Sequence, residues 1–183
     1  GALAGVPGLN GSGAEVESVS REFELCFRCH ADSRDKGEAY VKRDRPETNT
    51  RIEFNTANAS FHPVEGPGRN RDVPSLRAPW TSSSVMYCTD CHNNDQGPGA
   101  GGRGPRGPHG SSHAPILERR LEMRDFRPES DGAYALCYKC HERDSILGDE
   151  SFAFHRRHVV DEQAACTTCH DSHGVPSSSH LIN

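Results

Sequence analysis

Large apolar side chains are scarce in this chain. Leucine, isoleucine, valine and phenylalanine supply 30 of its 183 residues, and the mean hydropathy is −0.77. Such a composition is typical of disordered chains, which cannot bury enough apolar surface to offset the entropy lost on folding. No apolar stretch is long enough to cross a membrane, and no basic run with aromatic residues indicates nucleic-acid binding. A folded form therefore needs apolar surface from another source.

Cysteine is absent except in four copies of one motif, Cys-x-x-Cys-His. The motif residues are Cys26, Cys29 and His30; Cys88, Cys91 and His92; Cys137, Cys140 and His141; and Cys166, Cys169 and His170. This motif is the covalent attachment site of a c-type haem. Its cysteines form thioethers with the two vinyl groups, and its histidine, one helical turn from the first cysteine, is the proximal iron ligand. The sequence predicts four haem c groups as cofactors.

Two other kinds of site also use paired cysteines. Cys-x-x-Cys pairs build zinc sites and redox-active disulfides. Neither kind needs a histidine directly after the second cysteine, whereas all four copies here have one. Four haems are therefore the preferred interpretation, with zinc sites and a disulfide scaffold as the alternatives.

Haems would also supply the missing apolar surface. With roughly 46 residues per haem, the porphyrins would form most of the core, and the chain without them should be largely unfolded. The predicted fold class is mostly irregular coil with short α-helices and little or no β-sheet, a small multihaem cytochrome fold with haems as its core. The predicted organisation is a Gly-rich extension (1–20) followed by two dihaem halves (21–110 and 111–183) in one compact tetrahaem unit.

Local signals predict a few short helices between irregular segments. Ser20 can cap a helix through 21–30, Ser130 or Asp131 one through 133–143, and Asp149 or Ser151 one through 150–158. Residues 115–123 are compatible with a further helix. The segments 31–60 and 65–84 are expected to be irregular. The Gly- and Pro-rich segment 96–110 is either a flexible linker or a tight wrap along a haem face.

Methionine, the usual alternative to histidine as second axial ligand, is nearly absent. Only Met86 and Met123 exist, and Met86 is too close to Cys88 to reach the opposite face of that haem. Seven histidines lie outside the motifs, at positions 62, 109, 113, 155, 158, 173 and 180. The sequence therefore favours bis-histidine iron, which implies lower reduction potentials than Met/His ligation.

An internal repeat selects four of these histidines. In both halves a first Cys-x-x-Cys-His is followed by a His-x-Val, then by Cys-Thr-x-Cys-His, and then by a His-Gly. The predicted distal ligands are His62, His109, His158 and His173. His155 is the main rival of His158, and His113 and His180 rank lower. Because His173 is only three residues from His170, the two cannot hold one iron, and His173 is expected to bind a neighbouring haem.

With these residues in place, the sequence resembles the multihaem c-type cytochromes with doubled Cys-x-x-Cys-His motifs. The matching pieces are SFHPVEGPGRN, YCTDCHNND, GPHG, ALCYKCHER, SILGDESFAFHRRHVV and CTTCHDSHG, with a weaker match at ELCFRCH. In haem count and size the chain is also similar to the extracellular tetrahaem cytochromes of the OmcE type, which polymerise into nanowires. Residues 1–20 carry no resemblance.

The expected function is electron transfer without chemistry on a substrate. Bis-histidine iron has no open position, so the chain is not expected to be an enzyme. A small multihaem reductase of nitrogen or sulfur oxyanions is a second hypothesis, which requires one open haem. A third is a haem-stapled binding module without electron exchange.

The expected assembly is an extracellular or cell-surface helical homopolymer that passes electrons to other redox proteins or extracellular acceptors. Identical head-to-tail contacts that do not close generate such a filament. The Gly-rich N-terminus is expected to lie on a neighbouring subunit, and His62, on a segment extended by Pro63, is the expected ligand donated across the interface. The alternative is a soluble periplasmic tetrahaem carrier. Export by a cleaved signal peptide is expected in both cases, because c-type haem is attached outside the cytoplasm.

Overall fold

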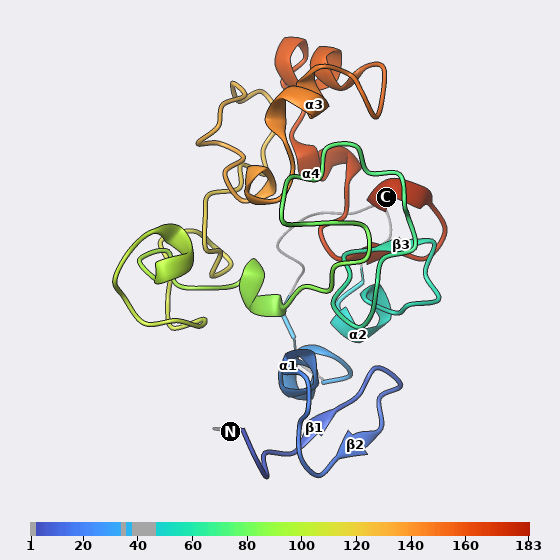
Figure 1. The fold of residues 1–183 in the computed structure, drawn as a ribbon, viewed down its shortest axis with the longest axis vertical. Coiled ribbons are helices and arrows are strands. Elements are labelled where there is room, and N and C mark those ends of the chain that lie inside the picture. The colour runs from blue at the N-terminus through green and yellow to red at the C-terminus, as the bar shows by residue number, and fades with distance from the viewer. Residues whose placement is uncertain (1–2, 34–35, 38–46) are drawn as a thin grey trace. The chain divides into compact units, whose positions relative to one another are not determined.

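Turns and coil make up most of the chain. The structure, a computed structural model, describes residues 3–33, 36–37 and 47–183 (Figure 1). The elements are β1 (Gly8–Leu9), β2 (Glu15–Val16), α1 (Glu22–His30), α2 (Thr50–Glu53), β3 (Ser60–Phe61), η1 (Cys88–Asp90), η2 (Pro98–Ala100), η3 (Cys137–Lys139), α3 (Arg143–Leu147), η4 (Arg157–Asp161), α4 (Cys166–Cys169), β4 (Gly174–Val175) and η5 (Ser179–Leu181). The prediction of coil with short helices and little sheet is confirmed. In the described part of the chain, no helix has the length and apolar character that crossing a bilayer requires.

The chain divides into two compact units that alternate along the sequence. The first contains Gly1–Asn70, Val85–Cys88 and His170–Asn183, and the second contains Arg71–Ser84 and Thr89–Cys169. The two dihaem halves were predicted from the positions of the haem-attachment motifs, and this division stays a prediction. Of the predicted segments, residues 1–2 of the N-terminal extension, and 34–35 and 38–46 of the irregular stretch, lie outside the described residues.

The Gly-rich N-terminal segment forms a hairpin. β1 and β2 pair antiparallel, with Gly8 opposite Val16 (Figure 1). The hairpin packs on α1 so closely that a Cβ at Gly8 would lie 2.6 Å from the backbone oxygen of Glu24. The order of this segment thus has an explanation within its own chain, and it no longer supports contact with a second subunit.

Helix α1 carries the first Cys-x-x-Cys-His motif and buries Phe23 and Phe27 on one side. Its N-cap residue is Arg21, so the prediction that Ser20 is the cap was wrong. Instead, the carboxylate of Glu24 accepts hydrogen bonds from the backbone N–H groups of Ser20 (2.7 Å) and Arg21 (2.9 Å). An acidic side chain in the first turn stabilises free N–H groups in this way.

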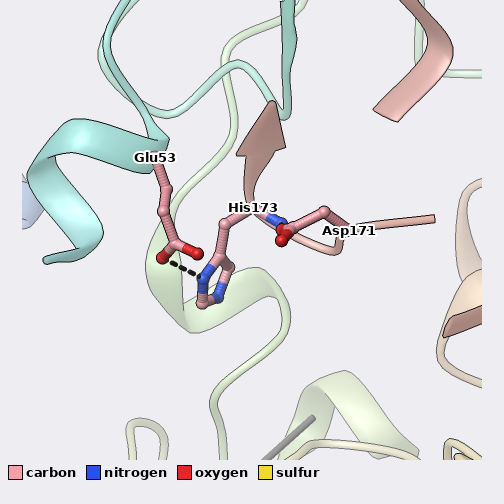
Figure 2. Close-up of side chains that lie close together, drawn as sticks. All are labelled: Glu53, Asp171 and His173. Carbon is pink, nitrogen blue, oxygen red and sulfur yellow. Dashed lines mark hydrogen bonds and ion pairs between the residues drawn. The ribbon is translucent and has the colours of Figure 1, made fainter. Parts of the chain in front are cut away.

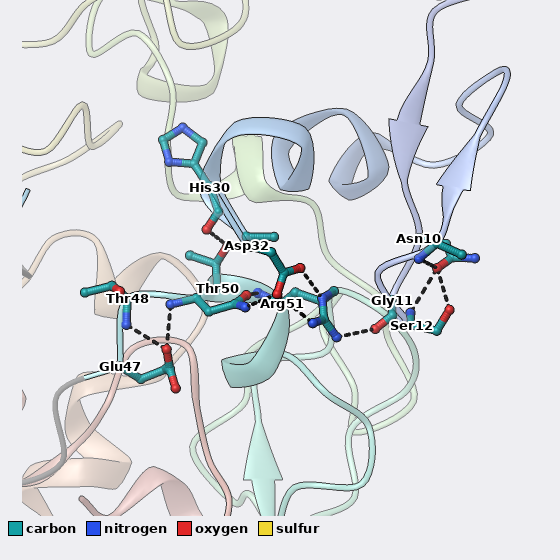
Figure 3. Close-up of polar contacts among 12 residues, drawn as sticks. Asn10, Gly11, Ser12, His30, Asp32, Glu47, Thr48, Thr50 and Arg51 are labelled. Atoms are coloured by element: carbon teal, nitrogen blue, oxygen red, sulfur yellow. Dashed lines mark hydrogen bonds and ion pairs between the residues drawn. The ribbon is translucent and has the colours of Figure 1, made fainter. Parts of the chain in front are cut away.

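Polar contacts join α1, α2 and the hairpin (Figure 3). The hydroxyl of Thr50 donates to the backbone oxygen of His30 at 2.7 Å. The guanidinium of Arg51 pairs with Asp32 at 2.8 Å and donates to the backbone oxygen of Gly11 at 3.4 Å. These bonds fix the C-terminal end of α1, where the first motif ends.

A second two-stranded sheet joins residues far apart in sequence. Ser60 pairs with Val175 and Phe61 with Gly174, antiparallel. A Cβ at Gly174 would lie 2.0 Å from the backbone oxygen of Glu53, so only glycine permits this close approach. The sheet therefore brings the end of α2 beside the segment that follows the fourth motif.

The second unit has a small aromatic core. Ala133, Tyr134, Tyr138 and Val159 are buried together, and partly buried residues that include Cys137 and Cys166 pack against them. The Tyr138 hydroxyl donates to the carboxylate of Glu129 at 2.9 Å. The core of this unit thus lies directly beside two of the motif cysteines.

Three predicted helices differ in the structure. Residues 115–123 are not helical, because Ile116 has a φ of 62°, in the left-handed region. Within 133–143 only η3, a 3₁₀ turn, forms before α3 begins. Within 150–158 the chain turns irregularly and enters η4, a π-helix, and Asp149 accepts from the backbone N–H of Arg156 at 2.8 Å.

The Gly- and Pro-rich segment 96–110 is a closed loop rather than a free linker. The side chain of Asn93 accepts from the backbone N–H of Gly107 at 2.8 Å, and that of Asn94 donates to the backbone oxygen of Pro105 at 3.1 Å. A Cβ at Gly102 would lie 2.1 Å from the backbone oxygen of Gln96. Glycine is needed at this position because another part of the same loop approaches it closely.

The carboxyl group of Glu65 is packed against the turn of the N-terminal hairpin. A Cβ at Gly11 would lie 2.5 Å from its Oε2, and its buried Oε1 has no hydrogen-bond partner among the described residues. Burial raises the pKa of Glu65 to about 7 from an ordinary 4.5, although the nearby charge of Arg51 opposes the shift.

We expect Glu65→Gln to stabilise the protein at high pH only. Since the folded-state pKa is the higher one, ionisation costs no stability below pH 4.5, costs progressively more up to pH 7, and is fully unfavourable above it. After solvent screening is allowed for, the gain at pH 8 should be about 1 to 2 kcal/mol. Thermal unfolding at pH 4 and pH 8 measures it. Exposed Glu17→Gln is the control, and an equal gain at both pH values would contradict the expectation.

Candidate functional site

All four Cys-x-x-Cys segments adopt a helical turn. The first lies in α1, the second begins η1, the third begins η3, and the fourth forms α4. In the third, the backbone N–H groups of Cys140 and His141 both donate to the backbone oxygen of Cys137, at 3.1 and 3.0 Å. A helical turn places residues i, i+3 and i+4 on one side. Each motif thus has its two cysteines on one side of a helical turn.

Three of the motif histidines are oriented by hydrogen bonds at Nδ1. In the first unit, Nδ1 of His170 lies 2.8 Å from the backbone oxygen of His180, and in the second, Nδ1 of His92 lies 3.2 Å from that of Pro115. A carbonyl oxygen can only accept, so Nδ1 carries the proton and the ring lone pair lies on Nε2. The ring of His141 contacts the hydroxyl of Ser75 through Nδ1 at 2.9 Å. His30, the fourth, is exposed.

Two predicted distal ligands, His62 and His173, lie on two neighbouring segments of the first unit, next to the pairing of β3 with β4. Nδ1 of His62 donates to the backbone oxygen of Ser172 at 2.7 Å, and its backbone N–H donates to the oxygen of His173 at 2.8 Å. Burial lowers the pKa of His62, and the hydrogen bond to Ser172 only partly opposes this. Burial likewise lowers the pKa of His170. Both imidazoles are therefore neutral at neutral pH, the state in which a histidine binds iron.

His173 has a different partner from the other predicted ligands. Its Nδ1 lies 2.9 Å from Oε2 of Glu53, while the carboxylate of Asp171 accepts from its backbone N–H at 2.6 Å (Figure 2). Glu53 and Asp171 are both buried. Sequence reasoning missed both residues. Asp171 directly follows a motif histidine, which was a usable signal, but Glu53 lies 120 residues from His173 and had none.

The two other predicted distal ligands are exposed residues of the second unit. His109 lies at the end of the closed loop and lines a cavity of about 350 Å³ with Asn94 and Ser112. His158 lies in η4 and stacks on Phe152, with ring centroids 5.9 Å apart and an interplanar angle of 18°. Its rival His155 contacts the same ring edge-on at 5.4 Å. His155 and His158 both contact Phe152, so the structure does not decide which of them is the distal ligand.

The first cysteines of successive motifs come together in pairs. The thiols of Cys26 and Cys88 lie beside each other in the first unit, and those of Cys137 and Cys166 lie beside each other in the second. The neighbouring thiol lowers the pKa of Cys26 and raises the pKa of Cys88 within the first pair, and the thiol of Cys166 raises the pKa of Cys137. All eight cysteines lie within the described residues, and none of them forms a disulfide there. The pairing follows the internal repeat, which groups motif one with two and three with four.

No zinc-type set of cysteines is present in the part of the chain that the structure describes. There, the one group with three potential ligand atoms within 4.8 Å of one another is Glu53, Asp171 and His173. A structural zinc site needs four nitrogen or sulfur ligands around one point.

Comparison of the chain with protein-family models, with curated proteins and with solved structures gives no match.

Proposed function

We propose that the chain is a tetrahaem c-type cytochrome that transfers electrons through closely spaced bis-histidine haems. The observation that carries the proposal is the orientation of the histidines. Motif histidines His92 and His170 and distal candidate His62 each donate from Nδ1 to a backbone oxygen. The hydrogen bond at Nδ1 fixes the tautomer, so that Nε2 would be the atom that binds the iron, as is usual for metal-binding histidines.

The donor set fits this cofactor. The eight thiols would hold four haems by thioether bonds, the four motif histidines would bind the irons, and four further histidines would complete the coordination. When bound, each haem supplies an iron that changes between the ferric and ferrous states. The residues of the chain fix the rings, exclude water and set the potentials through hydrogen bonds to the ligands.

The paired cysteines support close spacing of the haems. Because Cys26 contacts Cys88 and Cys137 contacts Cys166, the groups attached at these sulfurs would be neighbours within each pair. Electrons would then pass between haems one and two and between haems three and four. The aromatic rings of Tyr134 and Tyr138 lie beside the second cysteine pair and offer it apolar packing.

We expect the purified native protein to contain four haems, all low-spin. A pyridine haemochrome assay gives the count, and optical and electron paramagnetic resonance spectra give the spin state. The ferrous protein should not bind carbon monoxide, because no axial position is open. A native haem that is high-spin or binds carbon monoxide would contradict full ligation and favour the reductase alternative, which turnover assays with nitrite, hydroxylamine and tetrathionate would then examine.

The extracellular homopolymer stays a prediction, and so does the binding of His62 to a haem iron of a neighbouring subunit. His62 is hydrogen-bonded within its own chain, through its ring to Ser172 and through its backbone N–H to His173, so it is anchored rather than free to extend. These bonds leave its Nε2 as the ligand atom for any haem beside it. Electron microscopy of the purified protein distinguishes filaments from the periplasmic monomer.

A further inference from the structure

A buried carboxylate is bonded to one of the predicted distal ligands. The side chain of Glu53 is only 4% exposed, and its Oε2 lies 2.9 Å from Nδ1 of His173 (Figure 2). Glu53 is the last residue of α2, and the side chain of Asn58 donates to its backbone oxygen at 2.7 Å. The carboxylate is thus held in place by the end of the helix, independently of the histidine that it meets.

His173 is fixed just as firmly from other directions. Asp171 accepts from its backbone N–H at 2.6 Å, and its backbone oxygen accepts from His62 at 2.8 Å. The ring of Phe54 packs against the imidazole, with centroids 4.9 Å apart. The imidazole therefore has little freedom to turn away from Glu53.

A carboxylate affects a ligand histidine more strongly than a carbonyl does. A charged acceptor draws the Nδ1 proton toward itself and raises the electron density on Nε2. His62, His92 and His170 bond neutral backbone oxygens instead. His173 would thus be a stronger donor to iron than these three, and a stronger donor favours the ferric state.

We propose that Glu53 is a positioning residue that lowers the reduction potential of the haem whose iron His173 binds. The proposal rests on the proposed function, because it needs His173 to be an axial ligand. Its effect acts through His173, since the carboxylate bonds the far side of the ring from the ligand atom.

The same side chains offer a competing role, a site for a free cation between Glu53, Asp171 and His173. In that role Nδ1 would have to give up its proton and its bond to Glu53 in order to bind the ion. Asp171 already accepts from two backbone N–H groups, those of His173 and Gly174. The contacts therefore favour the hydrogen-bonded role.

The test is a potentiometric titration of the holoprotein and its Glu53→Gln variant, followed by optical and electron paramagnetic resonance spectra. Glutamine keeps a neutral acceptor and removes the charge. We expect one haem to shift to a higher potential and its low-spin signal to move, with the other three unchanged. Each tenfold loss of ferric over ferrous preference corresponds to about 59 mV. Glu53→Asp, which keeps the charge but shortens the side chain, should shift the potential less.

The matched control is Glu47→Gln, which removes a carboxylate from the same cavity of about 380 Å³ that Glu53 lines. The carboxylate of Glu47 accepts hydrogen bonds from the backbone N–H groups of Thr48 (2.9 Å) and Asn49 (2.7 Å). An equal shift in this control would reduce the effect to general charge and overturn the proposal. Four attached haems with unchanged potentials in Glu53→Gln would also overturn it, as would a chelator that reproduces the shift in the native protein. Absence of haem from the native protein would instead overturn the proposed function.

Discussion

Replacement of all eight motif cysteines by alanine should leave the chain largely unfolded. The group of buried apolar residues in the second unit contains Ala133, Tyr134, Tyr138 and Val159, which is a small core for a chain of this length. Without covalent haems, little buried apolar surface remains to offset the conformational entropy of so much coil. Far-UV circular dichroism and limited proteolysis should show loss of a cooperative transition and rapid digestion.

The matched comparison is a variant of one motif, Cys26→Ala with Cys29→Ala. It should lose one haem of four and destabilise the first unit, to which Cys26 and Cys29 belong. If the variant without any motif cysteine unfolds cooperatively at the native temperature, the haems are not the core and the proposed fold is wrong.

The second large effect is expected at the distal histidines. His62→Ala and His173→Ala should each convert one haem from low-spin to high-spin and allow its ferrous form to bind carbon monoxide, because each removes one axial ligand. His109→Ala should do the same. Of His155→Ala and His158→Ala, only one should do so, which decides between these neighbours. Optical spectra of variants that retain four haems provide the measurement.

His113→Ala and His180→Ala are the controls in this series. The contact of His180 with His170 uses its backbone oxygen, which survives removal of the side chain. Both variants should remain fully low-spin. A high-spin haem in either one, together with a low-spin His62→Ala protein, would show that the repeat selected the wrong histidines.

The features that sequence predicted well are local ones. Cys-x-x-Cys-His has a fixed spacing over five residues, and the structure gives all four copies the helical turn that this spacing needs. The hairpin at residues 8–16 was not predicted; its strands are joined through residues 10–14, where Gly13 has a φ of 85°, in the left-handed region that favours glycine. Coil content followed from the shortage of apolar residues.

The features that escaped prediction depend on contacts between distant segments. Glu53 reaches His173 only because Phe61 pairs with Gly174 and the backbone approaches closely there. The pairing of Cys26 with Cys88 and of Cys137 with Cys166 agrees with the repeat, but spacing alone does not determine it. The helix expected at 115–123 had suitable apolar residues, and the left-handed backbone at Ile116 excludes it.

The pairing of Ser60 with Val175 also determines when the first unit can finish folding. The first unit takes residues from both ends of the sequence, so its small sheet can close only after residues 170–183 have been synthesised and have found their partners. Contacts between such distant residues form late, since the intervening chain must first lose its freedom. Until then Cys26, Cys29 and Cys88 would lie on an open chain, accessible to whichever enzyme joins haem to them. Late closure of this sheet would thus leave time for haem attachment before the first unit is complete. A chain truncated before residue 170 should accept haem at its first motifs and should never complete this unit.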